Sequence, residues 1–164
     1  MQAIPGRRRT DVIEDILIRQ GNASDAAAIA ALEEECFSMP HSTDQLIREF
    51  NDNLHSAFVA EWHGQIAGFA GITVIADEGY IGNVAVKKEF RRRGIADRLM
   101  NALDGLAEKD QLRFISLEVR EGNKTALALY EKHGYTLQGC MKNYYTAPAE
   151  NALIYTKFYP SSLS

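Results

Sequence analysis

A basic, glycine-containing turn lies between a strand-like segment and a long amphipathic segment, and it restricts the folds open to the chain. Residues 81–86 before the turn are mostly apolar, and the segment after it repeats apolar residues with the spacing of one helix face. A strand that turns directly into a helix points backbone N–H groups and the positive end of the helix dipole at one place. The turn is therefore a predicted anion site. Its residues are Arg91, Arg92, Arg93, Gly94, Ile95 and Ala96.

The charge of this turn supports an anionic ligand. Residues 87–93 carry five cations and one anion, a net charge of +4, in a chain whose net charge is -4. The rest of the chain therefore carries -8, so the basic segment is not part of a generally basic surface. A solvated helix start is the alternative, and these six residues alone favour neither reading. The chain lacks both Gly-x-x-x-x-Gly-Lys-Ser/Thr and Gly-x-Gly-x-x-Gly, so we expect a different pyrophosphate compound.

The composition indicates one ordinary globular domain. A chain of 164 residues, with 46% hydrophobic and 24% charged residues, can bury its own core. We expect a flexible extension over residues 1–14 and a domain over residues 15–160. Cys36 and Cys140 are too few and too far apart for a disulfide framework, and Cys140 is interpreted as an inert buried thiol.

Several classes of partner and location are disfavoured by the same composition. The four histidines lack metal-ligand spacing, so no metal is expected. The net negative charge argues against nucleic-acid binding. No apolar run reaches the roughly 20 residues that a membrane span needs. The few cysteines suit a reducing compartment, and we expect a cytoplasmic protein.

Periodicity and turn signals predict a mixed α/β (α+β) fold with alternating groups of strands and helices. Ser42 with Gln45 forms a capping box, Asn123 is a helix cap, and Gly134 suits the end of a helix. Ser24 and Asp25 offer cap chemistry for the first helix, and His63 with Gly64 predicts a tight turn between two strands. A polar loop is expected between the last two strands. The predicted strands are 16–18, 57–62, 65–76, 80–86, 114–119, 135–142 and 153–158, and the predicted helices are 24–36, 42–51, 94–106 and 123–133.

The turn and its neighbours resemble the GNAT (Gcn5-related N-acetyltransferase) superfamily. Arg-x-x-Gly-x-Ala at residues 91–96 is similar to the acetyl-CoA signature of that family. The strand 83–86 and the helix with Asn123, Ala126 and Tyr130 look like its companion motifs. The resemblance extends over residues 15–158. It implies a single-domain acyl-CoA N-acyltransferase fold, a mixed and mostly antiparallel sheet whose central strands splay apart between flanking helices.

The resemblance also implies how acetyl-CoA, the expected co-substrate, would be held. The coenzyme would lie between the strands 81–86 and 114–118, with its pyrophosphate on residues 91–96. The N–H of Val84 would polarise the acetyl carbonyl, and Lys87, Lys88 and Arg92 could meet the 3′-phosphate. The pantetheine arm is expected to contact Val84, Ala85, Val86, Asn123, Ala126 and Tyr130.

Two side chains are implied as proton-transfer groups. An α-amine with a pKa of about 7.7–8.0 is partly protonated at neutral pH, so a base is needed. Glu118 is the candidate base, directly or through water, and its alternative is a surface carboxylate paired with Arg120. Tyr130 is the candidate acid for the leaving thiolate, and its alternative is an ordinary core tyrosine.

The acceptor side is expected to have two walls. One is the loop between the first two helices, where the family commonly has an aromatic residue, often Trp, after the proline, and this chain has His41. The other resembles the Asn-Tyr-Tyr segment of ribosomal-protein-alanine N-acetyltransferases. The final strand departs from the family, since Asn151 stands where an acidic residue is usual. The predicted acceptor-binding residues are Met39, Pro40, His41, Asn143, Tyr144 and Tyr145.

Three functions follow from these features. The leading hypothesis is acetyl transfer to the N-terminal α-amine of a protein, most closely a ribosomal protein, in a ternary complex. Residues 117–120, 128–131 and 143–145 resemble the ribosomal-protein-alanine enzymes and support it. A small-molecule amine is the alternative acceptor, and a non-catalytic acyl-CoA sensor is the third. We expect a monomer or weak homodimer.

Overall fold

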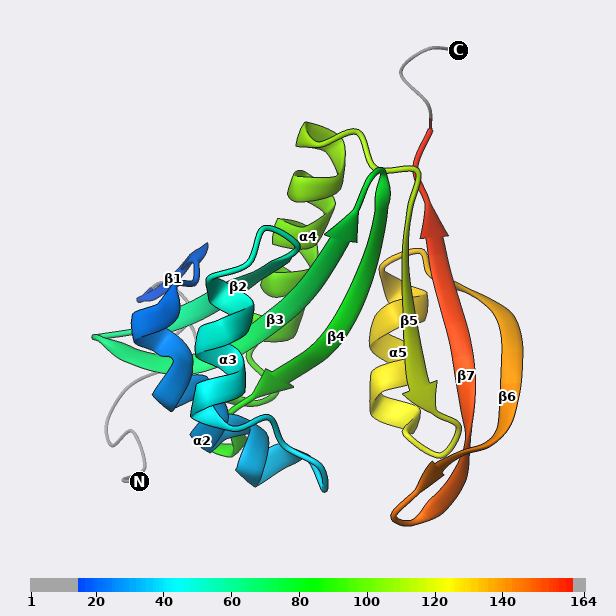
Figure 1. Ribbon diagram of the computed structural model, residues 1–164, viewed down its shortest axis with the longest axis horizontal. Coiled ribbons are helices and arrows are strands. Elements are labelled where there is room, and N and C mark those ends of the chain that lie inside the picture. The colour runs from blue at the N-terminus through cyan, green and yellow to red at the C-terminus, as the bar shows by residue number, and fades with distance from the viewer. Residues whose placement is uncertain (1–14, 161–164) are drawn as a thin grey trace.

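The structure is a computed structural model that describes residues 15–160. The predicted extension, residues 1–14, lies outside the described residues. Figure 1 shows helices on both sides of one curved sheet. The elements are β1 (Ile16–Gln20), the 3-10 turn η1 (Ala23–Asp25), α2 (Ala26–Cys36), α3 (Thr43–Phe50), β2 (His55–Trp62), β3 (Gln65–Ile75), β4 (Glu78–Val86), the 3-10 turn η2 (Lys88–Phe90), α4 (Ile95–Lys109), β5 (Phe114–Arg120), α5 (Lys124–Lys132), β6 (Thr136–Thr146) and β7 (Ala149–Phe158).

The strands of residues 15–160 form a single seven-stranded sheet in the order β1-β2-β3-β4-β5-β7-β6. All neighbours are antiparallel except β4 and β5, which run parallel. Helices α2 and α3 cover one face of β2–β4, and α4 and α5 lie on the opposite face (Figure 1). The predicted mixed, mostly antiparallel sheet between helices is confirmed.

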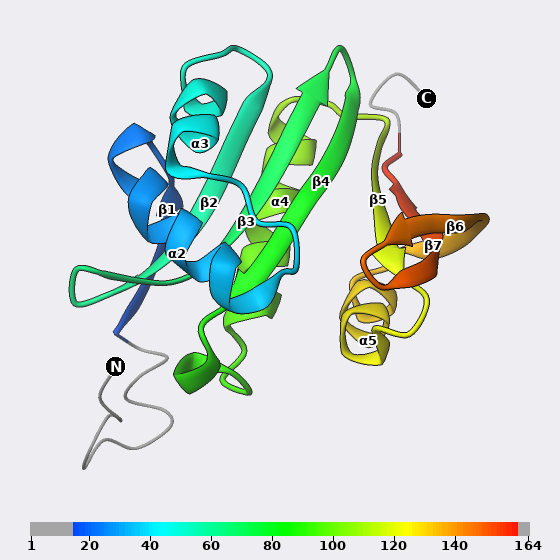
Figure 2. The same ribbon diagram turned by 60° about the horizontal axis from the view of Figure 1, so that its bottom comes forward.

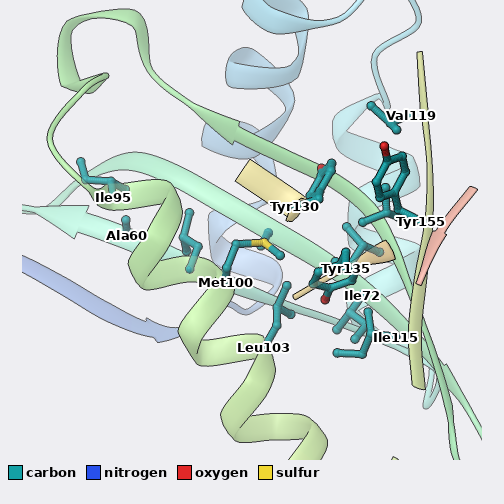
Figure 3. Packing of buried hydrophobic residues seen from close by; sticks show 14 of the residues in the cluster. Ala60, Ile72, Ile95, Met100, Leu103, Ile115, Val119, Tyr130, Tyr135 and Tyr155 are labelled. Carbon is teal, nitrogen blue, oxygen red and sulfur yellow. The ribbon is translucent and has the colours of Figure 1, made fainter. Parts of the chain in front are cut away.

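Two apolar cores attach the helices to the sheet. The larger core joins α4 and α5 to the sheet, and Figure 3 shows Ile95, Met100 and Leu103 of α4 facing it. The smaller core joins Ile29 and Leu32 of α2 and neighbouring residues to β2–β4. Each fully buried aliphatic side chain of this kind contributes about 1.5–3 kcal/mol. The apolar stripe predicted for α4 is therefore the face that fixes this helix on the sheet.

The parallel strands β4 and β5 pair only at one end. Their register runs from Glu78 opposite Phe114 to Tyr80 opposite Ser116 and stops there. β4 then stays with β3, and β5 stays with β7 as far as Arg120. Figures 1 and 2 show the two strands diverging beyond this point. The predicted splay of the central strands is confirmed.

Most local signals produce the expected structure. Ser42 and Gln45 form the capping box at the start of α3. His63 and Gly64 both have positive φ, which matches the tight turn predicted between β2 and β3. Gly134 has a φ of 91° just after α5. Before α2, the side chain of Asn22 caps the 3-10 turn η1 by accepting from the Ser24 N–H, and Asp25 occupies the N-cap position of α2 without a side-chain capping hydrogen bond to that helix.

Two expectations near the C-terminal end are wrong. The predicted polar loop is a hairpin, since β6 continues to Thr146 and β7 already begins at Ala149. β6 is an edge strand with most of its side chains exposed, so polar residues do not interrupt it. Cys140 lies on this strand and is exposed, not buried. No helix among residues 15–160 has the length and apolar character that a membrane crossing requires.

Candidate active site

The free edge of β4 is the frame of the site. The N–H of Lys87 donates to the carbonyl of Ala67 on β3 at 2.7 Å. Because successive residues of a strand direct their backbone groups to opposite sides, Ala85 also points to β3, whereas Val84 and Val86 point toward β5. β5 is not paired with β4 there. Val84 and Val86 are half-buried and Ala85 is buried. The backbone groups of Val84 and the N–H of Val86 remain for an extended ligand, whereas the Val86 carbonyl accepts from the Arg91 side chain.

The basic turn ends in the N-terminus of α4. Gly94 is the N-cap, with φ 80° and ψ 11°, and no side chain caps the helix. The first hydrogen bond along the helix runs from the N–H of Arg98 to the carbonyl of Gly94 at 3.2 Å. The N–H groups before it, on Ile95 and Ala96, carry the positive end of the helix dipole. The side chain of Ile95 is buried, so its contribution to the turn is its backbone.

The three arginines of the turn have different surroundings. Arg91 folds back on the protein, because its Nε–H donates to the Val86 carbonyl at 2.9 Å and its guanidinium reaches the Cys36 Sγ at 3.4 Å. It thus joins the end of β4 to α2. Arg92 is exposed and has a φ of 63°, whereas Arg93 is half-buried. Backbone N–H groups and exposed cations together form a surface suited to phosphate.

Helix α5 brings three of the predicted residues to the opposite side of the splay. Asn123 caps the helix, and its Oδ1 accepts from the Ala126 N–H at 3.2 Å. Ala126 is half-buried. Tyr130 is buried in the larger core, and its ring lies 5.9 Å from the ring of Tyr135 (Figure 3). The helix N-cap is therefore exposed, while the phenol near the other end of the helix is enclosed.

The phenol of Tyr130 is held in its protonated form. Burial, with a smaller contribution from the charge of Tyr145, raises the pKa of Tyr130 to about 12. The hydroxyl is therefore protonated at physiological pH, as in an ordinary tyrosine, so a proton is present, although burial makes the phenol a weaker acid. The core position and a role as proton donor are thus compatible.

Glu118 lies on the other face of β5. Its neighbours Leu117 and Val119 point into the larger core, so Glu118 faces away from it and is exposed. A hydrogen bond with Glu118 and its negative charge raise the pKa of the Tyr144 hydroxyl. The ion pair considered between Glu118 and Arg120 is not formed. The guanidinium of Arg120 instead lies 3.3 Å from the Glu150 Oε1 and stacks on the ring of Tyr145.

Asn143, Tyr144 and Tyr145 form a kink in β6 beside Glu118. Asn143 has a φ of 54°, and its N–H donates to the Asn151 Oδ1 at 2.9 Å. The register between β6 and β7 is irregular here. Tyr144 is 48% exposed, and its ring meets the ring of Tyr145 edge-on at 5.1 Å. Asn151, which departs from the family pattern, therefore holds the kink that presents Tyr144.

The loop between α2 and α3 carries the other predicted wall. Met39 and Pro40 are exposed, with Met39 at 74%. His41 instead contacts Glu33, a fully buried carboxylate of α2. Glu33 did not enter the predicted site because it begins a run of three glutamates, which is typical of a solvated helix face. The signal that could have identified it is its spacing, one helical turn after Ile29 on the apolar stripe.

The structure brings the predicted residues into two groups. The coenzyme-side residues lie at the end of β4, at the start of α4 and on α5, the elements around the point where β4 and β5 separate. Glu118 and Tyr144 lie together on the open face of β5 and β6. Tyr130 and Glu118 belong to opposite faces of the sheet, and β5, which carries Glu118, borders the splay on its side away from β4. A reaction in the splay could therefore exchange protons with groups on both faces.

Known proteins share this arrangement. The profile of the acetyltransferase (GNAT) family matches residues 26–135. A Bacillus subtilis (strain 168) protein, provisionally named a ribosomal protein bS18-alanine N-acetyltransferase, is 33% identical over 138 residues, which cover 84% of this chain and 91% of that protein. The ribosomal protein bS18-alanine N-acetyltransferase of Escherichia coli (strain K12) is 30% identical over 133 residues, 80% of this chain and 89% of that protein.

The likeness extends to three dimensions. The crystal structure of the ribosomal-protein-S18-alanine N-acetyltransferase from Escherichia coli matches with a TM-score of 0.81 at 27% identity, over 91% of this chain and 99% of that chain. The family profile covers more than half of the sequence, and the fold has the splayed strands that the family resemblance implied. The chain therefore belongs to the GNAT family and is an acetyl-CoA-dependent N-acetyltransferase.

Proposed function

We propose that this enzyme acetylates the N-terminal α-amine of a protein, most closely that of a ribosomal protein. The observation that carries the proposal is the exposed Tyr144 beside Glu118, because it places an accessible aromatic side chain for an extended chain end next to the proposed base. Two relatives at 30% identity or more carry names for this activity on ribosomal protein bS18. A cytoplasmic location and a monomer or weak homodimer stay predictions.

The donor is proposed to lie along the free edge of β4. Backbone groups of Val84 and Val86 would pair with the amide groups of the pantetheine arm as a further strand would. The N–H groups at Gly94, Ile95 and Ala96 suit the pyrophosphate. Asn123 would meet the arm from α5, through the part of its amide that does not cap the helix. These residues fit the coenzyme because they combine an unpaired strand edge with an uncapped helix start.

The proposed chemistry assigns one proton to each face of the sheet. Acetyl-CoA supplies a thioester carbonyl that an amine attacks, with a thiolate as the leaving group. Glu118 accepts the proton of the amine, directly or through a water molecule. The N–H of Val84 donates a hydrogen bond to the developing oxyanion. Tyr130 keeps a proton on its hydroxyl and gives it to the thiolate.

A small-molecule amine is the second candidate acceptor. A pocket of about 240 Å³ lies beside His41, between α3 and the sheet, and it has room for a small ligand. His41 also replaces the aromatic residue that is common after the proline in the family. A non-catalytic sensor is disfavoured, because both Glu118 and Tyr130 are retained.

The first prediction concerns Gly94. Gly94 and Gly64 share a φ near +80°, and each has open space where the β-carbon of an alanine would lie. We expect Gly94→Ala and Gly64→Ala to lower stability by a similar amount, about 1 kcal/mol each. Only Gly94→Ala should weaken acetyl-CoA binding, by about tenfold, because it disturbs the N–H groups of the turn. Calorimetric titration measures this, and equal affinities of the two variants would refute the pyrophosphate assignment.

The second prediction concerns Tyr130. Removing the proposed proton donor in Tyr130→Phe should lower kcat by about 100-fold. The dissociation constant of acetyl-CoA should stay within about twofold, because the ring is retained. Tyr135→Phe is the matched control, since Tyr135 is also buried and lies beside Tyr130. An unchanged kcat for Tyr130→Phe, or an equal loss for both variants, means that Tyr130 is not the acid.

The third prediction concerns the acceptor. A peptide that begins with the alanine of a ribosomal protein N-terminus should gain one acetyl group on its α-amine, as located by fragment mass spectrometry. The same peptide with a blocked α-amine and an internal lysine is the control and should stay unmodified. Acetylation of a polyamine, amino acid or drug in preference to the free peptide would favour the small-molecule alternative instead.

A further inference from the structure

A buried carboxylate on the acceptor side has no part in the proposed chemistry. Glu33 lies on α2 with an exposed fraction of 1% and lines the 240 Å³ pocket under α3. A carboxylate removed from water is strongly destabilising unless hydrogen bonds or an opposite charge compensate it. The groups that bond to the Glu33 carboxylate therefore indicate its structural role.

Groups from two other segments satisfy Glu33. The side-chain amide of Asn83 on β4 donates to its Oε1. The backbone N–H of His41 donates to Oε2 at 3.3 Å, and the His41 Nδ1 lies 3.0 Å from Oε1 and 3.2 Å from Oε2. Asn83 directly precedes Val84 on the free edge of β4. Glu33 thus ties the loop 37–42 to the strand proposed to hold the donor.

The charge on His41 is set by groups from both helices. Besides Glu33 on α2, Glu49 on α3 places its Oε1 3.7 Å from the His41 Nε2. β4 contributes the neutral Asn83. Burial of the ring opposes protonation, but the hydrogen bond with Glu33 and the charges of Glu33 and Glu49 outweigh it and raise the pKa of His41.

One further imidazole lines the pocket. His55, at the start of β2, is a lining residue together with His41. It pairs instead with Asp52, whose Oδ2 lies 2.6 Å from the His55 Nδ1. Asp52 precedes β2 and His55 is its first residue, so this pair does not connect to the loop 37–42. His55 therefore provides a matched imidazole with a different partner.

We propose that Glu33 and His41 form a positioning pair that holds the loop 37–42 against β4, and that protonation of His41 tightens this loop for the acceptor. The inference rests on the proposed function, since it takes the loop as one wall of the acceptor site. An aromatic residue after the proline, which is common in the family, has no charge that titrates near neutrality. The pH-dependent loop is thus specific to chains with an imidazole at this position.

The direction of the pH effect follows from the raised pKa. The ion pair is fully formed below the ordinary histidine pKa of about 6.5 and is lost as the pH rises through the higher pKa of the folded state. The acceptor amine itself binds and reacts differently across this range. The comparison of variant with wild type at each pH removes that contribution, because both use the same amine.

Kinetics with the full chain test the pair. His41→Gln keeps a hydrogen-bond donor and loses the charge. This substitution should raise the acceptor KM about fivefold at about pH 6 and by less than about twofold at about pH 8.5. Most of the loss in kcat/KM should come from KM rather than from kcat. His55→Gln should leave the acceptor KM unchanged at both pH values. An equal KM ratio for His41→Gln at the two pH values, or the same pH-dependent ratio for His55→Gln, would overturn the proposal.

A second measurement does not depend on the acceptor. In ¹H–¹⁵N spectra of the wild type, the amides of Met39 and Ser42 should shift with the titration of the His41 ring, at a midpoint above about 6.5. In Glu33→Gln the titration midpoint of His41 should fall, and the amide shifts of Met39 and Ser42 should no longer change with that titration. Loop amides that ignore the His41 titration in the wild type contradict the positioning pair. A protein that acetylates no peptide contradicts the proposed function alone.

Discussion

The structure depends on the point at which two parallel neighbours in the sheet stop pairing. β4 and β5 are hydrogen-bonded as far as Tyr80 and Ser116 and then separate. Unpaired backbone groups are costly when they are buried, so a strand edge left open inside a fold needs a partner from outside the chain. The edge at Val84 and Val86 is therefore both a weakness of the sheet and the reason that a ligand can extend it.

Helix α4 connects the two halves of the sheet on either side of the splay. Its apolar face packs on the β1–β4 half, and two side chains reach across to the other half. Asp97 lies 2.7 Å from the His133 Nε2 after α5, and Asp104 lies 2.9 Å from the Lys157 Nζ on β7. The same helix starts at Gly94 beside the open edge. One element thus holds the halves together and presents the N–H groups that suit a pyrophosphate.

The sheet also separates the two sides of the proposed reaction. Tyr130 is enclosed in the core on the α4 side, where burial raises its pKa and its hydroxyl is protonated. Glu118 and Tyr144 are on the open side, where water and an extended chain have access. Glu33 and His41 border the open side from α2 and its following loop. An amine and a thioester that meet in the splay would find a base and an acid on different faces.

The sequence predicted the parts of this fold that have strong local causes. Periodicity predicted the apolar stripe of α4, and local backbone preferences predicted the cap at Ser42 and the turn at Gly64. All three are present in the structure. The β6–β7 hairpin was missed because polar composition cannot distinguish a loop from an exposed edge strand. Glu33 was missed because it begins a run of glutamates, and only the folded chain brings Asn83 and His41 to its carboxylate.

The family resemblance, rather than periodicity, supplied the residues of the candidate site. Composition and spacing indicated an anion at residues 91–96 and nothing about an amine. The roles of Glu118 and Tyr130 depend on the distance between strands that meet only after folding. No local pattern in the sequence encodes that separation, which arises from the short pairing of β4 with β5.

The central claim is that acetyl-CoA completes the open edge of β4. Amide hydrogen exchange, followed residue by residue by NMR, tests it most directly. The account predicts that saturating acetyl-CoA slows exchange at Val84 and Val86, whereas Ala85 and Lys87, which point to β3, change little. Exchange at Val84 and Val86 that is unaffected by bound acetyl-CoA would contradict it.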